Sequence, residues 1–121
     1  MTHKQKSIIV IAHGSRKSNA NLQVHKLTST LASCVPEYNW LAAFMELGSP
    51  SIAEAISQAL ADGSSAITIL PLFLVDGNHS ENDIPRMVKA SLNDHPEIEL
   101  SFLPVLCNQE GFVEFICQII K

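Results

Sequence analysis

Hydrophobic residues along the chain alternate between short continuous runs and longer stripes with helical spacing. The first run, residues 7–12, is rich in β-branched side chains and is typical of a parallel strand buried on both faces. After a polar turn, a stripe with a spacing of three or four residues predicts an amphipathic helix, which ends before Pro36. The stripe consists of Ala20, Val24, Leu27, Leu31 and Cys34.

The same alternation occurs three more times. Further strands are predicted at residues 38–45, 66–74 and 98–103. Ser51 and Glu54 have the spacing of a capping box, which predicts the start of the second helix. We expect the third helix to begin near Asp83, because a start at Ser80 would place Pro85 in the helix interior and remove a hydrogen bond. A fourth apolar stripe begins at Phe112.

Strands that alternate with amphipathic helices predict an α/β fold with right-handed crossovers. We expect residues 1–121 to form a single domain with a small, flavodoxin-like, open parallel sheet and helices on both faces. The expected strand order is 2-1-3-4. Alternating polarity in the fourth strand indicates the edge of the sheet.

Composition excludes several classes of protein. The formal net charge is −4. The sequence has no cluster of Lys and Arg of the kind that binds nucleic acids. No apolar segment is long enough to span a membrane, and the first run is too short for a signal peptide. We therefore expect a cytoplasmic protein. No CxxC pair occurs among the cysteines Cys34, Cys107 and Cys117, which argues against an iron–sulfur cluster or a structural zinc site. We expect all three thiols to be buried.

Polar residues with metal-binding or acid–base chemistry follow three of the predicted strands. His13 follows the first, Glu46 the second, and the segment 76–79, ending in His79, the third. Ligands bind open parallel sheets at the carboxyl ends of the strands. Two neutral imidazoles there could hold Co²⁺, Fe²⁺ or Ni²⁺, and a carboxylate could add a ligand or accept a proton.

Each of these residues also has a purely structural interpretation. A single histidine at a strand end is more often structural or simply exposed, and Glu46 could instead favour the dipole of the following helix. We expect the remaining histidines, His3, His25 and His95, to be solvated. Only the convergence of several such residues on one edge indicates a site.

Three motifs together resemble the small class II tetrapyrrole chelatases, the sirohydrochlorin cobaltochelatases of the short CbiX-like form. The first motif is the segment AHGSR at 12–16, directly after the first strand. The second is FME at 44–46, followed by Pro-Ser at a helix start. The third and most specific is LFL at 72–74, with Gly77, His79 and the segment DIP at 83–85 at fixed spacing. The motifs follow the order of the family.

The resemblance implies an activity and a set of site residues. The family inserts a divalent metal into sirohydrochlorin, a macrocycle with eight carboxylates, without an organic cofactor. The metal ligands would be His13 and His79, with Glu46 as the acidic catalytic residue. We expect the macrocycle to contact Gly14, Ser15, Arg16, Gly77 and Arg86. Longer relatives contain two such units, so the resemblance also implies a homodimer.

Other functions remain as alternatives. A phosphotransfer receiver domain requires acidic residues after the first strand, where this chain has His13. A histidine phosphatase requires an arginine before the histidine, where the chain has Ala12. A non-catalytic metal or tetrapyrrole carrier with the same fold is compatible with the motifs, because the segment 105–110 departs from the glycine-containing loop that is usual in the family.

Overall fold

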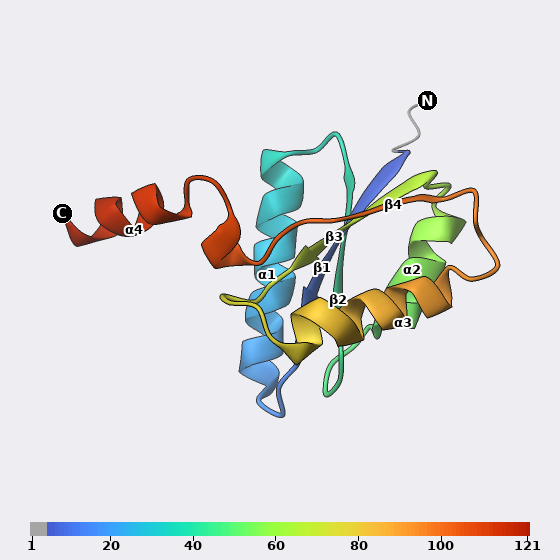
Figure 1. The fold of residues 1–121 in the computed structure, drawn as a ribbon, viewed down its shortest axis with the longest axis horizontal. Coiled ribbons are helices and arrows are strands. Elements are labelled where there is room, and N and C mark those ends of the chain that lie inside the picture. Colours follow the sequence, from blue (N-terminus) through green and yellow to red (C-terminus); the bar gives the residue numbers. More distant parts are fainter. Residues whose placement is uncertain (1–4) are drawn as a thin grey trace.

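A parallel four-stranded sheet forms the centre of the molecule (Figure 1). The computed structural model describes residues 5–121, so His3 lies outside the described residues. The strands are β1 (Lys6–Ala12), β2 (Asn39–Phe44), β3 (Ala66–Pro71) and β4 (Glu99–Phe102). Their order is β2-β1-β3-β4 and all neighbours pair in parallel, which confirms the predicted topology.

Four α-helices connect or follow the strands. They are α1 (Ser18–Cys34), α2 (Ile52–Ala61), α3 (Ile84–Ser91) and α4 (Phe112–Ile120). A π-helical turn, η1 (His79–Asp83), precedes α3, and a short 3-10 turn, η2 (Leu106–Asn108), precedes α4. None of the helices in residues 5–121 is long and apolar enough to cross a membrane.

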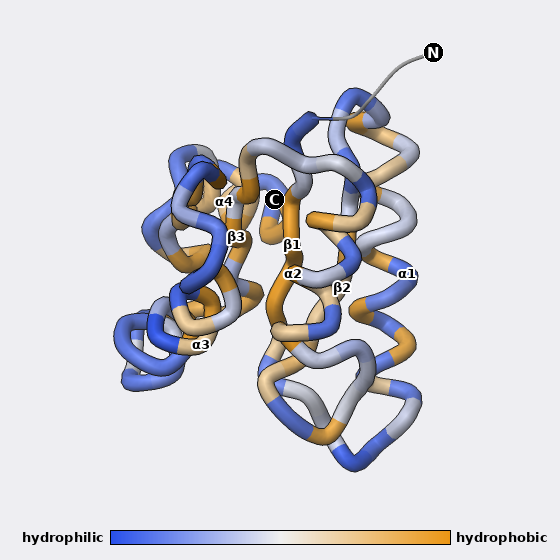
Figure 2. Tube along the Cα trace, turned by 90° about the vertical axis from the view of Figure 1, so that its right-hand side faces the viewer, coloured by the Kyte–Doolittle hydropathy of each residue, from blue (hydrophilic) through white to orange (hydrophobic). Residues whose placement is uncertain are grey.

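The main hydrophobic core lies between the sheet and the helices α2 and α3. Alternate residues of β1 and β3 point into it, as the pleat of a strand requires. The tube in Figure 2 shows the apolar character of β1 at the centre of the molecule. The core side chains from the strands are Ile9, Ile11, Ala43, Ile67 and Ile69, and those from the helices are Ile52, Ala55, Ile56, Ala59, Ile84, Val88 and Leu92.

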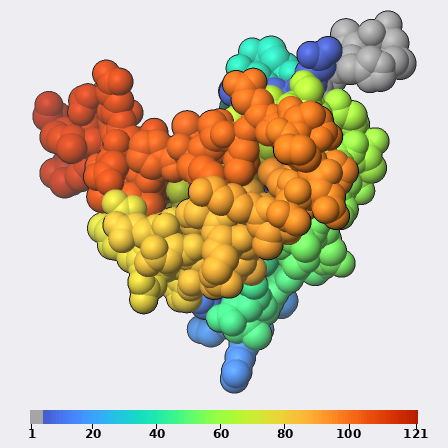
Figure 3. Space-filling view, turned by 45° about the vertical axis from the view of Figure 1, so that its right-hand side comes forward, coloured from blue at the N-terminus to red at the C-terminus, as the bar shows by residue number. Residues whose placement is uncertain are grey.

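The other face of the sheet is covered only in part, because α4 projects away from the body of the molecule (Figures 1 and 3). The predicted stripe of α1 is therefore partly open, and Leu27 is 39% exposed. A groove of about 420 Å³ runs between α1, β3 and the start of α4. It is lined mainly by Leu27, Leu31, Leu70, Leu72, Leu106, Phe112 and Phe115.

Two expectations about polar and sulfur-containing residues are wrong. All three thiols, Cys34, Cys107 and Cys117, are exposed, because they lie at the end of α1, on η2 and on the projecting α4. His25 is half-buried rather than solvated: its Nε2 lies 3.0 Å from the carbonyl of Ser49, and its ring packs against Phe44.

The prediction for the region 66–85 is correct in its main outline but not in its boundaries. β3 ends at Pro71, three residues earlier than predicted, although the amide of Leu72 still donates to the carbonyl of Ile11 in β1. The α-helix begins at Ile84, near Asp83 as predicted, with Pro85 in its first turn. Helical structure nevertheless starts earlier, because the π-helical turn places the N–H of Ile84 on the carbonyl of His79.

The ends of β1 and β2 are held together by an unusually close backbone contact at Gly14. The amides of Met45 and Glu46 donate to the carbonyls of Ala12 and His13. A Cβ atom at Gly14 would lie 1.6 Å from the carbonyl oxygen of Glu46, and the φ of Gly14 is +99°. Only glycine fits this position. Gly14 therefore has a structural role, in addition to its expected contact with the macrocycle.

The capping box at the start of α2 is present as predicted, and it generates a stability prediction. The Ser51 hydroxyl accepts from the Glu54 amide, and the Glu54 carboxylate accepts from the Ser51 amide, which lowers the pKa of Glu54. Ser51→Ala should reduce the free energy of unfolding by about 1 kcal/mol in urea titrations. Ser57→Ala, an exposed position on the same helix, should change it by less than about 0.5 kcal/mol. Equal effects of the two variants would contradict the capping assignment.

Gly14→Ala should destabilise the protein by at least roughly 2 kcal/mol, because the substitution adds both strain and a backbone clash. Gly77→Ala provides the matched control, since a Cβ there meets nothing within 4 Å. The two urea midpoints, measured under the same conditions, check this difference. A Gly14→Ala protein as stable as Gly77→Ala would show that the close contact does not exist in solution.

Candidate metal-insertion site

His13 and His79 line one cavity of about 320 Å³ at the carboxyl ends of β1 and β3. Their ring centroids lie 4.9 Å apart, and the ring planes are tilted by 59°. The remaining lining comes from the segment between β3 and α3: Phe73, Val75, Asp76, Gly77, Asn78 and Ser80. The structure thus brings together the two histidines that the sequence singled out.

The separation of the two rings suits a single shared ion. Imidazoles that bind one ion at about 2.0–2.1 Å and at an angle of about 90–110° have centroids roughly 4.5–5.3 Å apart. The observed value for His13 and His79 lies within this range. Both side chains are about half exposed, so an ion could reach them from solvent.

Glu46 contacts the ring of His13. Its Oε2 is 3.2 Å from His13 Nε2, and its side chain is 59% exposed. The backbone contacts at Gly14 hold the two residues in this position. Glu46 does not line the cavity between the histidines, and residues 5–121 contain no group of three His, Cys, Asp or Glu side chains that could hold a metal ion.

The surroundings of His13 are unusual because both ring nitrogens face acceptors. Nδ1 lies 3.2 Å from the carbonyl oxygen of Gly14, while Nε2 faces the Glu46 carboxylate. A neutral imidazole has one N–H and can donate to only one of them. The tautomer of His13 therefore decides whether its N–H points to the Gly14 carbonyl or to Glu46.

The structure also places an acidic residue, Asp83, beside His79, although its sequence position alone did not indicate a role in the site. Asp83 Oδ2 lies 2.9 Å from His79 Nδ1, and Asp83 Oδ1 accepts from Arg86 Nη2 at 3.0 Å. These hydrogen bonds, first from Arg86 and then from His79, lower the pKa of Asp83. The lowered pKa favours the charged form of Asp83, which only accepts hydrogen bonds.

Asn21, on α1, is a second residue that sequence reasoning missed. Its Oδ1 accepts from the Ser15 amide, and its Nδ2 donates to the carbonyls of Ser15 and Leu47. Asn21 therefore links the loop that follows His13 to the loop that follows Glu46. Only the general preference of asparagine for bonds to nearby backbone could have suggested this role.

The loop after β4, which departs from the pattern of the family, supports the loop that carries His79. The amides of Leu106 and Cys107 donate to the carbonyls of Phe73 and Leu74. Asn108 Nδ2 donates to Asp76 Oδ2 at 3.2 Å. The altered segment thus supports the loop that lines the cavity, although none of its own residues lines it.

The residues expected to contact a macrocycle surround the cavity unevenly. Gly77 lines it, whereas Gly14 packs against the backbone of Glu46. Ser15 is half-buried and accepts from the Lys17 amide. Arg16 is exposed, and Arg86, 71% exposed, pairs with Asp83. The arginines therefore remain accessible to an acidic ligand.

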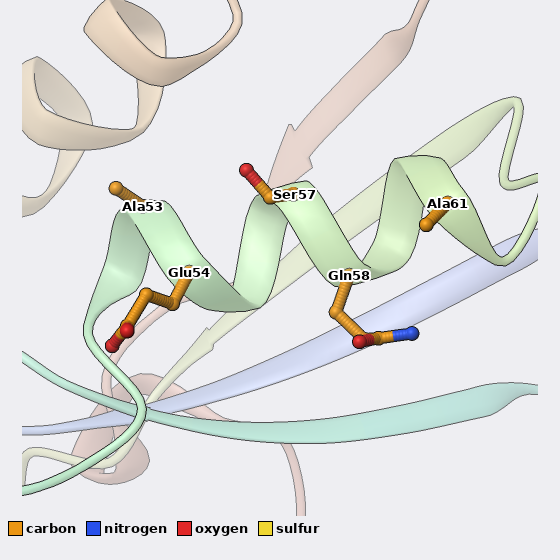
Figure 4. Close-up of a pocket in the computed structure, with 5 residues that line it drawn as sticks. All are labelled: Ala53, Glu54, Ser57, Gln58 and Ala61. Carbon is orange, nitrogen blue, oxygen red and sulfur yellow. The ribbon is translucent and has the colours of Figure 1, made fainter.

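A larger depression elsewhere lacks comparable chemistry. It has a volume of about 430 Å³ and lies along α2 (Figure 4). Its lining is Ala53, Glu54, Ser57, Gln58 and Ala61. Glu54, the only ionisable residue among these, is already engaged in the capping box. The cavity with the two histidines remains the best candidate site.

Comparison with known proteins agrees with this geometry. The sequence matches the CbiX family over residues 7–121. It is 31% identical to a sirohydrochlorin cobaltochelatase of Methanosarcina barkeri over 99% of this chain and 94% of the relative. A second cobaltochelatase, from Methanococcoides burtonii, is 35% identical over 68% of this chain and 63% of its own length.

Several matches cover only part of the relative. Its matches with several curated cobaltochelatases cover 57–63% of their length. The sirohydrochlorin chelatase SirB of Bacillus subtilis subspecies spizizenii, solved in complex with cobalt, has the same fold with a TM-score of 0.85 at 22% identity. That match covers 96% of this chain and 50% of SirB. Because the family match extends over residues 7–121, the chain belongs to the CbiX family.

Proposed function

We propose that this protein inserts a divalent metal ion, Co²⁺ in the first place and Fe²⁺ or Ni²⁺ as alternatives, into sirohydrochlorin. The observation that carries the proposal is the pair of imidazoles, His13 and His79, 4.9 Å apart in one cavity. Further support comes from the CbiX family match and from relatives named as cobaltochelatases. Residues 1–121 would act as one chelatase domain.

In this proposal the two histidines hold the incoming ion. His13 and His79 replace two of its water molecules and leave other coordination positions to water and to the macrocycle nitrogens, as catalytic metal sites do. Both imidazoles must be neutral to bind, so ion binding should weaken as the pH falls. A complete protein cage would hold the ion too firmly to pass it on.

Insertion also releases two pyrrole protons, which leave as the two nitrogen–metal bonds form. Glu46 is suited to this step, because its carboxylate is 59% exposed and lies 3.2 Å from His13. Such a proton, or the metal ion itself, could be taken up between His13 Nε2 and the Glu46 carboxylate. Glu46 therefore acts either as the base or as a further ligand of the ion.

The acidic macrocycle would be bound by cations and backbone amides around the cavity. Arg16 is exposed, and Arg86 is 71% exposed with guanidinium donors beyond the Nη2 that contacts Asp83. Gly14, Ser15 and Gly77 would supply backbone at the edge of the site. Arginine is well suited to carboxylates because it can donate two parallel hydrogen bonds.

We further propose that the protein acts as a homodimer, with α4 in the contact between the two copies. Support comes from the exposed apolar side chains of α4 and from the apolar groove at its base. Val113, Phe115, Ile119 and Ile120 are each more than half exposed. The match to half of the longer SirB chain is in line with a second copy.

We also propose a location in the cytoplasm. The three exposed thiols suit a reducing compartment of this kind.

The proposed function is tested by metal insertion into sirohydrochlorin, followed by absorbance with Co²⁺, Fe²⁺ and Ni²⁺ in turn. His13→Ala and His79→Ala should each lose more activity than the roughly 10–100-fold typical of losing an outer-shell partner. His95→Ala is a matched control, since that histidine is 41% exposed and pairs with Glu97 outside the cavity. Near-wild-type activity in both site variants would refute the roles of the histidines, whereas tight sirohydrochlorin binding without accelerated insertion would select the carrier alternative.

Glu46→Gln should reduce the insertion rate by about 10²–10⁴-fold if Glu46 is the base. Because glutamine keeps the size of the side chain, the stability of the metal-free protein should not change. Equilibrium binding of Co²⁺ distinguishes the two roles, since loss of a base leaves ion affinity intact and loss of a ligand weakens it. A variant with unchanged rate and unchanged affinity would exclude both roles.

The proposed dimer contact is tested by the mass of the protein in solution. Ile119→Glu should convert a dimer into a monomer, because it places a charge on the apolar surface of α4. Gln118→Glu introduces the same charge at the neighbouring position and should leave the dimer intact. Light scattering coupled to size-exclusion chromatography measures the result. A monomeric wild-type protein, or a dimeric Ile119→Glu variant, would contradict the proposed contact.

A further inference from the structure

Asp83 is the carboxylate between His79 and Arg86, and both of its oxygens are used. Oδ2 lies 2.9 Å from His79 Nδ1, while Oδ1 accepts from Arg86 Nη2 at 3.0 Å. The Asp83 side chain is 31% exposed, less than those of its two partners. Arg86 therefore fixes the orientation of the carboxylate that contacts His79.

The π-helical turn η1 creates this arrangement. His79 and Asp83 are the first and last residues of the turn, which places them on neighbouring positions of one helical face. The turn closes with the N–H of Ile84 on the carbonyl of His79, one residue later than in an α-helix. Pro85 lies in the first turn of the regular helix α3, so Asp83 stays at the junction between the two helical segments.

This contact determines which nitrogen of His79 is free. A carboxylate accepts hydrogen bonds only, so Nδ1 must carry the hydrogen. The lone pair of a neutral His79 is then on Nε2. Histidines that bind metals commonly donate their other N–H to a carboxylate in the same way.

We propose that Asp83 is a positioning residue for metal insertion, which holds His79 as its Nδ1–H tautomer and directs Nε2 to the ion. The inference rests on the proposed function for the role of the ion, but the tautomer itself does not depend on it. Asp83 would not touch the metal or the macrocycle. Arg86 supports Asp83 and, through its remaining donors, is free to contact an acidic substrate.

The two carboxylates at the site thus have different tasks. Asp83 contacts Nδ1 of its histidine, whereas Glu46 contacts Nε2 of His13, and Nδ1 of His13 faces the Gly14 carbonyl instead. Asp83 is also the less exposed of the two, at 31% against 59%. A half-buried carboxylate with a contact at each oxygen orients a ring, while a more exposed one beside the ligating nitrogen can exchange a proton or an ion.

The first part of the test reads the tautomer directly in the metal-free protein. Long-range ¹H–¹⁵N NMR of the imidazole rings, at a pH at which they are neutral, should show His79 as the Nδ1–H form, with the signals assigned by His79→Ala. Asp83→Ala removes the acceptor and should shift His79 towards the Nε2–H form. Asp83→Glu should restore the wild-type form in part. An Nε2–H form in the wild type, or no change in Asp83→Ala, would overturn the inference.

The second part connects the tautomer to the reaction. Asp83→Ala should weaken Co²⁺ binding or insertion by about 10–100-fold while the KM for sirohydrochlorin stays close to that of the wild type. Glu97→Gln, which alters the carboxylate 3.5 Å from His95, is the matched control and should change neither property. Circular dichroism and thermal melting verify that the variants are folded. A KM effect without any change in ion binding or turnover would overturn the positioning role.

The two proposals fail in different ways. If the tautomer responds to Asp83 but the wild-type protein inserts no metal, the proposed function is refuted and the assignment of the tautomer stands. If the protein inserts metal and His79 keeps its tautomer without Asp83, the positioning role is refuted and the proposed function stands.

Discussion

The parallel pairing of β1 with β2 on one side and with β3 on the other is the constraint on which the site depends. Since the three strands run in the same direction, their carboxyl ends meet at one edge of the sheet. His13, Glu46 and the loop that carries His79 all follow these ends. The site therefore requires no contact between distant surfaces, only a short backbone path from each strand.

The hydrogen-bonding capacity of imidazole explains why each histidine has its own carboxylate. His79 has a single acceptor at Nδ1, and a neutral ring satisfies it. His13 has acceptors at both nitrogens, and a neutral ring can donate to only one of them. The same pair of residue types can thus orient a ligand at one position and leave a carboxylate open to a proton or an ion at the other.

The sequence was sufficient to predict the sheet order and the meeting of His13 with His79, because both follow from the alternation of elements and the direction of the strands. The role of Asp83 was not predictable in this way, since it depends on a π-helical turn whose hydrogen-bond pattern has no distinct hydrophobic period. The exposure of α4 also escaped prediction. A stripe of apolar residues such as Phe115 and Ile119 shows that a helix has an apolar face, but not which surface covers it.

X-ray absorption spectroscopy of the Co²⁺-loaded protein, without tetrapyrrole, tests the central claim most directly. The account predicts a spectrum with the multiple-scattering signal of two imidazole rings and with the remaining ligands being oxygen. Loss of one ring signal should follow the removal of either His13 or His79. A spectrum of fully hydrated cobalt, or one in which neither histidine contributes, would contradict the account.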